Sequence, residues 1–399
     1  MKLISLIRRI VPFKKEDEER FLKWSQELSK EDSKFLKKYL KLKEISFAEN
    51  KISNSFASFN YVQLKYNNQY NSNENKSVEK KEVKEFADRI NIKIKNRVDQ
   101  TLFSQFAPFA FQKISSLVAP DIHGNDHLKE SATIILFSDE PLHLLLLGDP
   151  GTGKTDIIRS AAELHPKHSF GLGSGTSGAG LVVSAKGNEI IPGLLPLADG
   201  GICAIDELNL MKEESRAGLY NAMEKGFVSY DKGGHHYKFN SRVNVIATAN
   251  PKGDSFTAKN LKELKMQLPF EDALLSRFHL LFFIYKPGIE EFKKISKSIL
   301  TKSKSKIKDE DIEFVKEYIT YALKIKVSFP SEFEPDITNI VAKIKSNENK
   351  YARPISPRFV IGLMRMSKAI ARSRLSSKVE RIDLDKAQEI LEKSLEWKM

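Results

Sequence analysis

Cysteine is nearly absent from this 399-residue sequence, and long hydrophobic runs are absent too. The single cysteine, Cys203, excludes both an internal disulfide framework and a zinc site built on several cysteines of one chain. It is compatible with a reducing cytosol, so we expect a cytoplasmic protein. No apolar run approaches the ~18 residues that a membrane helix requires, so no membrane span is expected. Hydrophobic residues at 41% and charged residues at 29% also exclude a fibrous or wholly disordered chain.

The charge is strongly unbalanced toward basic residues. The formal net charge is +13, and residues 1–100 hold 23 Lys and Arg against 15 Asp and Glu by count along the sequence. Such an excess favours an acidic polymer as partner, and nucleic acid is the obvious candidate, single- or double-stranded DNA included. A basic, solubilising surface would give the same excess, so charge alone leaves both interpretations open. With DNA as partner, the expected location is the cytoplasm, at the nucleoid.

Composition and hydrophobic periodicity divide the chain into three regions. Residues 1–100 are basic and mostly helical in pattern, with a polar linker near 66–80 and a possible protein partner. Strand and helix patterns alternate over residues 101–286, which indicates an α/β core with a parallel sheet covered by helices. Residues 287–399 carry helical periodicity and are expected to form a helical lid.

A phosphate-binding loop is the clearest motif. An apolar run at residues 142–147 predicts a buried strand, and an amphipathic segment at 156–164 predicts a helix. Between them lies a match to G-x-x-x-x-G-K-[ST], formed by Gly148, Asp149, Pro150, Gly151, Thr152, Gly153, Lys154 and Thr155. Backbone N–H groups of such a loop close around the phosphates of ATP at the positive end of the helix. We expect Lys154 to reach the β- and γ-phosphates and the Thr155 hydroxyl to ligate Mg²⁺.

Two further strand patterns end in polar residues. The segment 201–207 ends in Asp206 and Glu207, about 50 residues after the loop. In P-loop ATPases the first carboxylate holds magnesium and the second polarises the attacking water, and we assign the two residues accordingly. The segment 242–251 contains Asn250, placed to orient a water molecule or to contact the γ-phosphate.

Several short sequence segments resemble segments of the AAA+ motor of the minichromosome maintenance (MCM) replicative helicases and occur in the same order as in that family. They are Phe111–Gly124, Thr176–Leu181, Leu197–Ile202, Asp206–Met211, Ala222–Glu224, Leu274–Phe278, Ile355–Phe359 and Ala369–Arg372. The likeness covers about residues 105–285 and, more loosely, 310–395. It implies a P-loop AAA+ core with β-hairpin insertions, an ATP-dependent DNA helicase or translocase, and a ring, typically a hexamer.

The resemblance also implies roles for individual residues. Arg277, in Leu274–Phe278, would be the arginine finger that enters the neighbouring subunit's site, and Arg358 would be the sensor arginine, also reaching across the interface. The Gly-Gly turn within 228–239 predicts a β-hairpin where the family has a DNA-contacting one. Lys232 is therefore the first candidate for DNA contact, and Lys186, in a second expected hairpin at 183–190, is a weaker one.

The sequence departs from the family in two places. The loop reads Gly153-Lys154-Thr155 where the family usually has Ala-Lys-Ser, and the region before the motor is expected to be shortened and atypical, because one cysteine cannot supply a zinc ribbon of the Cys type. Two alternatives to a DNA motor are a protein-remodelling ATPase of the MoxR or chelatase kind and a nucleotide-gated regulatory subunit. Intact Lys154, Asp206, Glu207 and Arg277 argue against the second.

Overall fold

A computed structural model describes residues 102–186, 189–232, 235–253, 255–301 and 309–397. The predictions for residues 1–100, including the linker near 66–80, lie outside these ranges. Residues from Phe109 onward form one compact unit.

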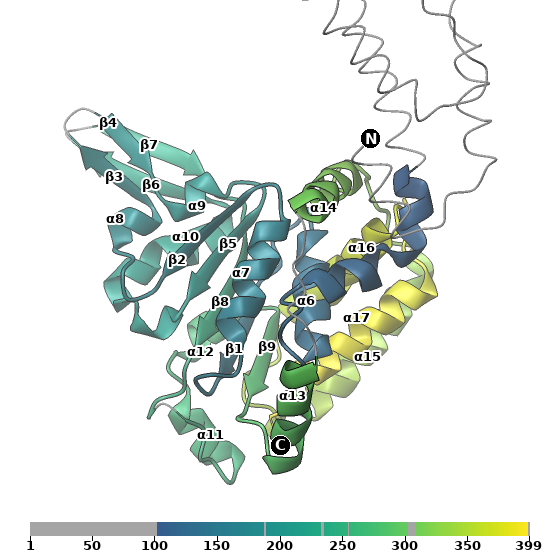
Figure 1. Ribbon diagram of the computed structural model, residues 1–399. Helices are drawn as coiled ribbons and strands as arrows, with labels where there is room; N and C mark the ends of the chain where they lie inside the picture. Colours follow the sequence, from purple (N-terminus) through teal and green to yellow (C-terminus); the bar gives the residue numbers. More distant parts are fainter. Residues whose placement is uncertain (1–101, 187–188, 233–234, 254, 302–308, 398–399) are drawn as a thin grey trace, which may run out of the picture. The chain divides into compact units, whose positions relative to one another are not determined.

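The core of this unit is a parallel sheet, as the sequence predicts (Figure 1). Five strands lie in the order β2-β5-β8-β1-β9, and all neighbouring pairs are parallel. Their bounds are β1 Leu144–Gly148, β2 His168–Leu172, β5 Ile202–Asp206, β8 Asn244–Ala249 and β9 Leu280–Ile284. The strands β1, β5 and β8 are entirely buried, which explains why they are mainly apolar in sequence.

Helices cover both faces of the sheet. Helix α7 (Lys154–Leu164) packs on β2, β5 and β8 and against α6 (Asp126–Leu136). On the other face, α10 (Ala217–Lys225) contributes Leu219 and Met223 to the core cluster that includes Leu145 and Leu147 of β1. Alternate residues of one strand thus face different layers.

Two β-hairpins interrupt the helix–strand alternation, as expected. The first pairs β3 (Val183–Lys186) with β4 (Glu189–Pro192), and the second pairs β6 (Phe227–Lys232) with β7 (His235–Asn240). Figure 1 shows both projecting from the same end of the core, away from the C-terminal helices. Short helices α8 (Gly178–Leu181) and α9 (Leu194–Leu197) flank the first hairpin, and α11 (Leu261–Gln267) and α12 (Asp272–Leu275) follow β8.

The C-terminal part is helical, which confirms the expected lid. It contains α13 (Ile289–Thr301), α14 (Asp309–Ala322), α15 (Glu334–Ser346), α16 (Arg358–Ser373) and α17 (Arg381–Lys393). Helix α16 packs on α6, α15 and α17.

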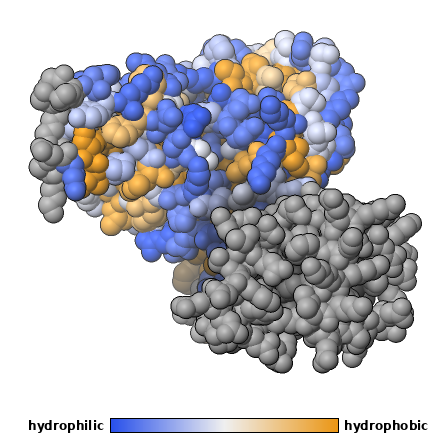
Figure 2. Space-filling model, turned by 90° about the horizontal axis from the view of Figure 1, so that it is seen from above, coloured by the Kyte–Doolittle hydropathy of each residue, from blue (hydrophilic) through white to orange (hydrophobic). Residues whose placement is uncertain are grey.

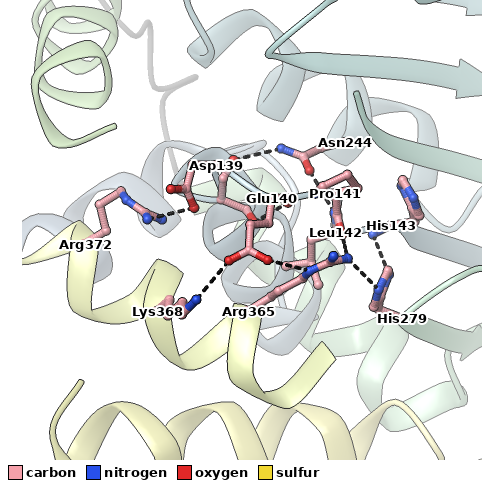
Figure 3. Close-up of polar contacts among 11 residues, drawn as sticks. Asp139, Glu140, Pro141, Leu142, His143, Asn244, His279, Arg365, Lys368 and Arg372 are labelled. Carbon is pink, nitrogen blue, oxygen red and sulfur yellow. Dashed lines mark hydrogen bonds and ion pairs between the residues drawn. The ribbon is translucent and has the colours of Figure 1, made fainter. Parts of the chain in front are cut away.

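Basic side chains of α16 attach the lid to the segment between α6 and β1 (Figure 3). Glu140 receives hydrogen bonds from Arg365 at 3.1 Å and Lys368 at 3.0 Å, and Asp139 pairs with the buried Arg372 at 2.7 Å. This attachment crosses more than 200 positions of sequence.

The surface carries both hydrophilic and hydrophobic residues. The face seen in Figure 2 is mainly hydrophilic, with separate hydrophobic patches between. Among the described residues, no helix has the length and hydropathy to cross a bilayer.

Candidate nucleotide site

The loop after β1 has a backbone that only glycine permits at three points. A Cβ on Gly148 would lie 2.3 Å from the carbonyl oxygen of Ile284 in the adjacent strand β9. Gly151 and Gly153 have φ angles of +75° and +79°, in the left-handed region that glycine adopts without strain. These glycines let the chain turn sharply from the buried strand into α7, with the first amides of the helix at the turn.

Lys154 is folded into this loop. Its Nζ donates to the carbonyl oxygens of Gly148 at 2.8 Å and Asp149 at 2.6 Å, and its side chain is buried. Burial lowers the pKa of the Lys154 ammonium to about 8, although Asp149, Asp206 and Glu207 oppose that shift. The ammonium is thus a buried cation beside acceptors of its own loop, available to an anionic ligand held there.

A cluster of oxygens lies beside it. Thr155 Oγ1 donates to the Asp206 carboxylate, at 2.9 Å from Oδ1 and 3.1 Å from Oδ2, and Thr248 Oγ1 donates to Asp206 Oδ1 at 2.5 Å. The Glu207 amide in turn donates to Thr248 Oγ1 at 2.8 Å. One hydroxyl and one carboxylate are hard ligands that suit Mg²⁺, which typically takes one or two carboxylates plus substrate phosphates. The donor set therefore fits the predicted magnesium site at Thr155 and Asp206.

The carboxyl ends of three neighbouring strands place three residues of the predicted site at one edge of the sheet. Gly148, Asp206 and Asn250 stand at or just after the carboxyl ends of β1, β5 and β8, which are neighbours in the sheet. The amide of Asn250 donates to Asn209 Oδ1 at 3.0 Å. Glu207 has a φ angle of +51°, so the chain bends sharply directly after Asp206.

Asp149 uses its side chain differently from the other loop residues. Its buried carboxylate accepts hydrogen bonds from the amides of Phe256 at 2.7 Å and Lys286 at 3.0 Å. The loop is thereby tied to the segment after Asn250 and to the end of β9. The side chain of Asp149 is an anchor for the loop, and only its backbone is available to a nucleotide.

Arg277 and Arg358 lie at the other edge of the sheet. Arg277 precedes β9, whose first residue Leu280 pairs with Leu144, the first residue of β1, whereas the loop follows Gly148 at the far end of β1. Five residues of strand separate the two edges by about 16 Å. Arg358 joins Arg277 there, because its Nη1 donates to the carbonyl oxygen of Ser276 at 3.2 Å.

A carboxylate of α10 links these two arginines. Arg277 Nη2 donates to Glu224 Oε2 at 3.0 Å, and Arg358 Nη2 lies 3.7 Å from Glu224 Oε1. Arg277 also donates to the carbonyl oxygen of Ala273 at 2.5 Å and lies over the ring of Tyr220. The two predicted trans-acting arginines therefore form one cluster, apart from the residues of their own phosphate loop.

Three residues of the site have roles that sequence reasoning did not assign. Thr248 bridges Asp206 and Glu207, Asn209 supports Asn250, and Glu224 joins the two arginines. Thr248 of β8 could have been predicted from the alternation of side chains along a strand. It precedes Asn250 by two residues, and side chains two residues apart point to the same face. Glu224 lies in the segment Ala222–Glu224 that resembles the family, but nothing in that segment indicated its contacts with the two arginines, because they are remote in sequence.

The predicted DNA-contact lysines lie next to the turns of the two hairpins. Lys186 is the last residue of β3 and pairs with Glu189, and Lys232 is the last residue of β6 and pairs with His235. The backbone therefore brings both positions to hairpin ends.

This fold and this site define a P-loop ATPase domain of the AAA+ class. The family model of the MCM P-loop domain matches residues 101–303, and that of the MCM AAA-lid domain matches residues 313–395. The chain belongs to the minichromosome maintenance family.

Named relatives agree with this assignment. The minichromosome maintenance protein MCM of Saccharolobus solfataricus is 32% identical over 72% of this chain and 45% of its own length. The DNA replication licensing factors MCM7 of Arabidopsis thaliana and mcm7 of Xenopus tropicalis are 29% and 28% identical, each over 71% of this chain and 43% of their own length. The chain spans less than half of the length of these relatives.

Proposed function

We propose that this chain is the motor of a ring-forming, ATP-dependent DNA helicase or translocase. The observation that carries the proposal is the split site: the phosphate loop and acidic pair lie at one edge of the sheet, and Arg277 and Arg358 at the other. Neither arginine reaches its own loop across a strand of about 16 Å, which supports a role for each at the site of a neighbouring subunit. Repetition of such a head-to-tail contact closes a ring, and a hexamer is the expected size.

Within one interface, the residues divide the work of hydrolysis. The loop amides and Lys154 bind the phosphates of ATP, and Thr155 and Asp206 would hold Mg²⁺, which supplies charge neutralisation at the phosphates. Glu207 polarises the attacking water, and Asn250 orients it or contacts the γ-phosphate. Arg277 and Arg358 of the adjacent subunit neutralise the charge that develops on the transferring phosphoryl group.

DNA would be contacted by the hairpin ends. Lys232 and, more weakly, Lys186 would contact phosphates through interactions that do not depend on sequence and weaken with salt. Their backbone positions at the hairpin ends support this role. The net charge of +13 and the replication factors among the relatives support DNA as the partner and the nucleoid as the location. Residues 1–100 would bind a protein partner.

ATP hydrolysis with and without single-stranded DNA tests the proposal. At about 0.1 M salt phosphate contacts are screened but not abolished. We expect DNA to stimulate hydrolysis by the full chain, and the Glu207→Gln variant to show neither basal nor stimulated turnover, which excludes a contaminating ATPase. Turnover that DNA does not change would instead favour a protein-remodelling ATPase. ATP binding without any turnover would favour a regulatory subunit.

A further inference from the structure

Arginines of the lid hold the segment Ser276–His279, which contains Arg277. Arg353, in the loop before α16, donates from Nη1 to the carbonyl oxygen of Phe278 at 2.6 Å and from Nη2 to that of His279 at 2.8 Å. On the other side of Arg277, Arg358 donates to the carbonyl oxygen of Ser276. Lid arginines thus hold the carbonyl of Ser276, before Arg277, and the carbonyls of Phe278 and His279, after it.

A third lid arginine, Arg365, contacts the last residue of this segment, His279, and also the residues before β1. Its Nη1 lies 3.5 Å from His279 Nε2 and donates to the carbonyl oxygen of Pro141 at 2.6 Å, while its Nε donates to Glu140 (Figure 3). The His279 ring also accepts a hydrogen bond at Nδ1 from the amide of His143. The end of the segment is therefore connected both to the lid and to the start of β1.

Arg353 differs from the other two lid arginines in its surroundings. Its side chain is 2% exposed and lies over the ring of Phe359, 4.6 Å from the centroid. Burial lowers the pKa of its guanidinium to about 9, and no carboxylate pairs with it within the described ranges. A buried charge without a counterion is costly. The planar fork of Arg353 offsets part of that cost through its hydrogen bonds to two consecutive backbone carbonyls.

We infer that Arg353 is a positioning residue that aims Arg277, so that the lid of one subunit governs hydrolysis at the nucleotide site of its neighbour. The inference rests on the proposed function, in which Arg277 acts across the interface. Because peptide units are planar, the Ser276 carbonyl held by Arg358 fixes the unit that leads into Arg277, and the Phe278 amide, which donates to the carbonyl oxygen of Leu275, fixes the unit that follows it. Arg353 holds the next unit along the chain, at the Phe278 carbonyl, and so restrains the backbone beyond Arg277. A rotation of the lid then moves Arg277 with it.

Single variants test the positioning role against a merely structural one. For Arg353→Met we expect at least a tenfold loss of ATP turnover with unchanged ATP affinity. Arg353→Lys should retain an intermediate rate, since one ammonium does not reproduce the fork. The matched control is Arg372→Met, which removes an equally buried lid arginine that contacts Phe137, Ile325 and Asp139 instead. Thermal unfolding of all three shows how much of each loss reflects stability. If the loss of ATP turnover is proportional to the fall in unfolding temperature, with the same proportion in all three variants, the inference is overturned.

Mixed subunits give the sharper test. Lys154→Ala lacks the phosphate-loop lysine and Arg277→Ala lacks the finger, so a mixture restores complete sites at about one interface in four. We expect Arg353→Met to restore turnover when mixed with Lys154→Ala but not when mixed with Arg277→Ala, because both members of the second pair lack a correctly aimed finger.

The outcomes separate the two proposals. If the reference pair of Lys154→Ala and Arg277→Ala restores turnover and Arg353→Met restores it with both partners alike, the role of Arg353 is wrong and the split site stands. If the reference pair itself stays inactive, the action of Arg277 across the interface is wrong, and the inference about Arg353 is overturned with it.

Discussion

Arg277 and Arg358 share one carboxylate, that of Glu224 on α10, although the two arginines come from different parts of the chain. The carboxylate accepts from Arg277 at 3.0 Å, and Arg358 lies 3.7 Å from its second oxygen. The cluster brings one arginine of the core and one of the lid to the same point. Lid and core thus present their two cationic groups together.

Glu224→Gln should slow ATP turnover about tenfold while leaving ATP affinity unchanged. Without the negative charge of Glu224, the side chains of Arg277 and Arg358 regain rotamer freedom, and ordering each of them again costs about 1–2 kcal/mol. A cost of about 1.4 kcal/mol in activation free energy corresponds to a tenfold lower rate. Steady-state kinetics gives both quantities. Glu332→Gln is the control, because Glu332 pairs with the exposed Lys378 of the lid. A rate equal to that of the wild type would show that Glu224 does not position the arginines.

Arg277→Ala should lower ATP turnover by about three orders of magnitude, the loss typical of arginine fingers. ATP binding should persist, because Arg277 and the phosphate loop lie at opposite edges of the sheet. Fluorescent-nucleotide titration measures binding, and phosphate release measures turnover. The control is Arg381→Ala, which removes an exposed lid arginine paired with Asp336 and Asp385. Normal turnover of the Arg277 variant would rule out the finger.

Lys232→Ala should weaken DNA binding and reduce its salt dependence, while basal ATP hydrolysis is unchanged. Removal of one lysine–phosphate interaction reduces the slope of log K against log salt by about 0.7 for a single strand. Fluorescence anisotropy at several salt concentrations measures that slope, with Lys378→Ala in the lid as the control. Equal losses of DNA binding and basal hydrolysis would count against the hairpin as a DNA-binding element.

Acid should destabilise the fold between pH 6.5 and 4. Burial lowers the pKa of His143 from 6.5 to about 3 and that of His165 to about 4. In this window the unfolded chain binds protons that the native state excludes. The free energy of unfolding therefore falls as pH falls, by about 1.4 kcal/mol per pH unit for each histidine.

Urea unfolding at pH 7 and pH 5 measures this dependence. His143→Gln should reduce the difference between the two pH values, because it removes one of the buried groups. His236→Gln, at an exposed position of the second hairpin, should leave the difference unchanged. An unchanged difference in the His143 variant would show that this histidine does not contribute to acid destabilisation.

Local patterns were sufficient to predict the elements that carry the phosphate site. The strand predicted at residues 142–147 is β1, the helix at 156–164 lies within α7, and the segments 201–207 and 242–251 contain β5 and β8. Such elements are predictable because buried parallel strands are continuous apolar runs and the loop between β1 and α7 requires glycine. The second hairpin was predictable for a related reason, since its turn and strand residues are adjacent in sequence, whereas the first was expected from the family resemblance.

Interactions between remote residues were not predictable. Glu224 looks like any exposed helical acid, and Arg353 like any surface arginine, until the chain is folded. The carboxylate of Asp149 belongs to a recognisable motif, yet its partners Phe256 and Lys286 lie more than 100 positions away.

The sequence by itself therefore determined the class of protein, its family and the residues of the predicted phosphate loop, because these depend on short, contiguous patterns. Only the tertiary structure decided where Arg277 and Arg358 stand relative to the phosphate loop. The order and parallel direction of β1 and β9 place them at the opposite edge, and that order depends on how the whole sheet packs. The same packing buries Arg353 against the backbone beside Arg277, because it brings the lid onto the core.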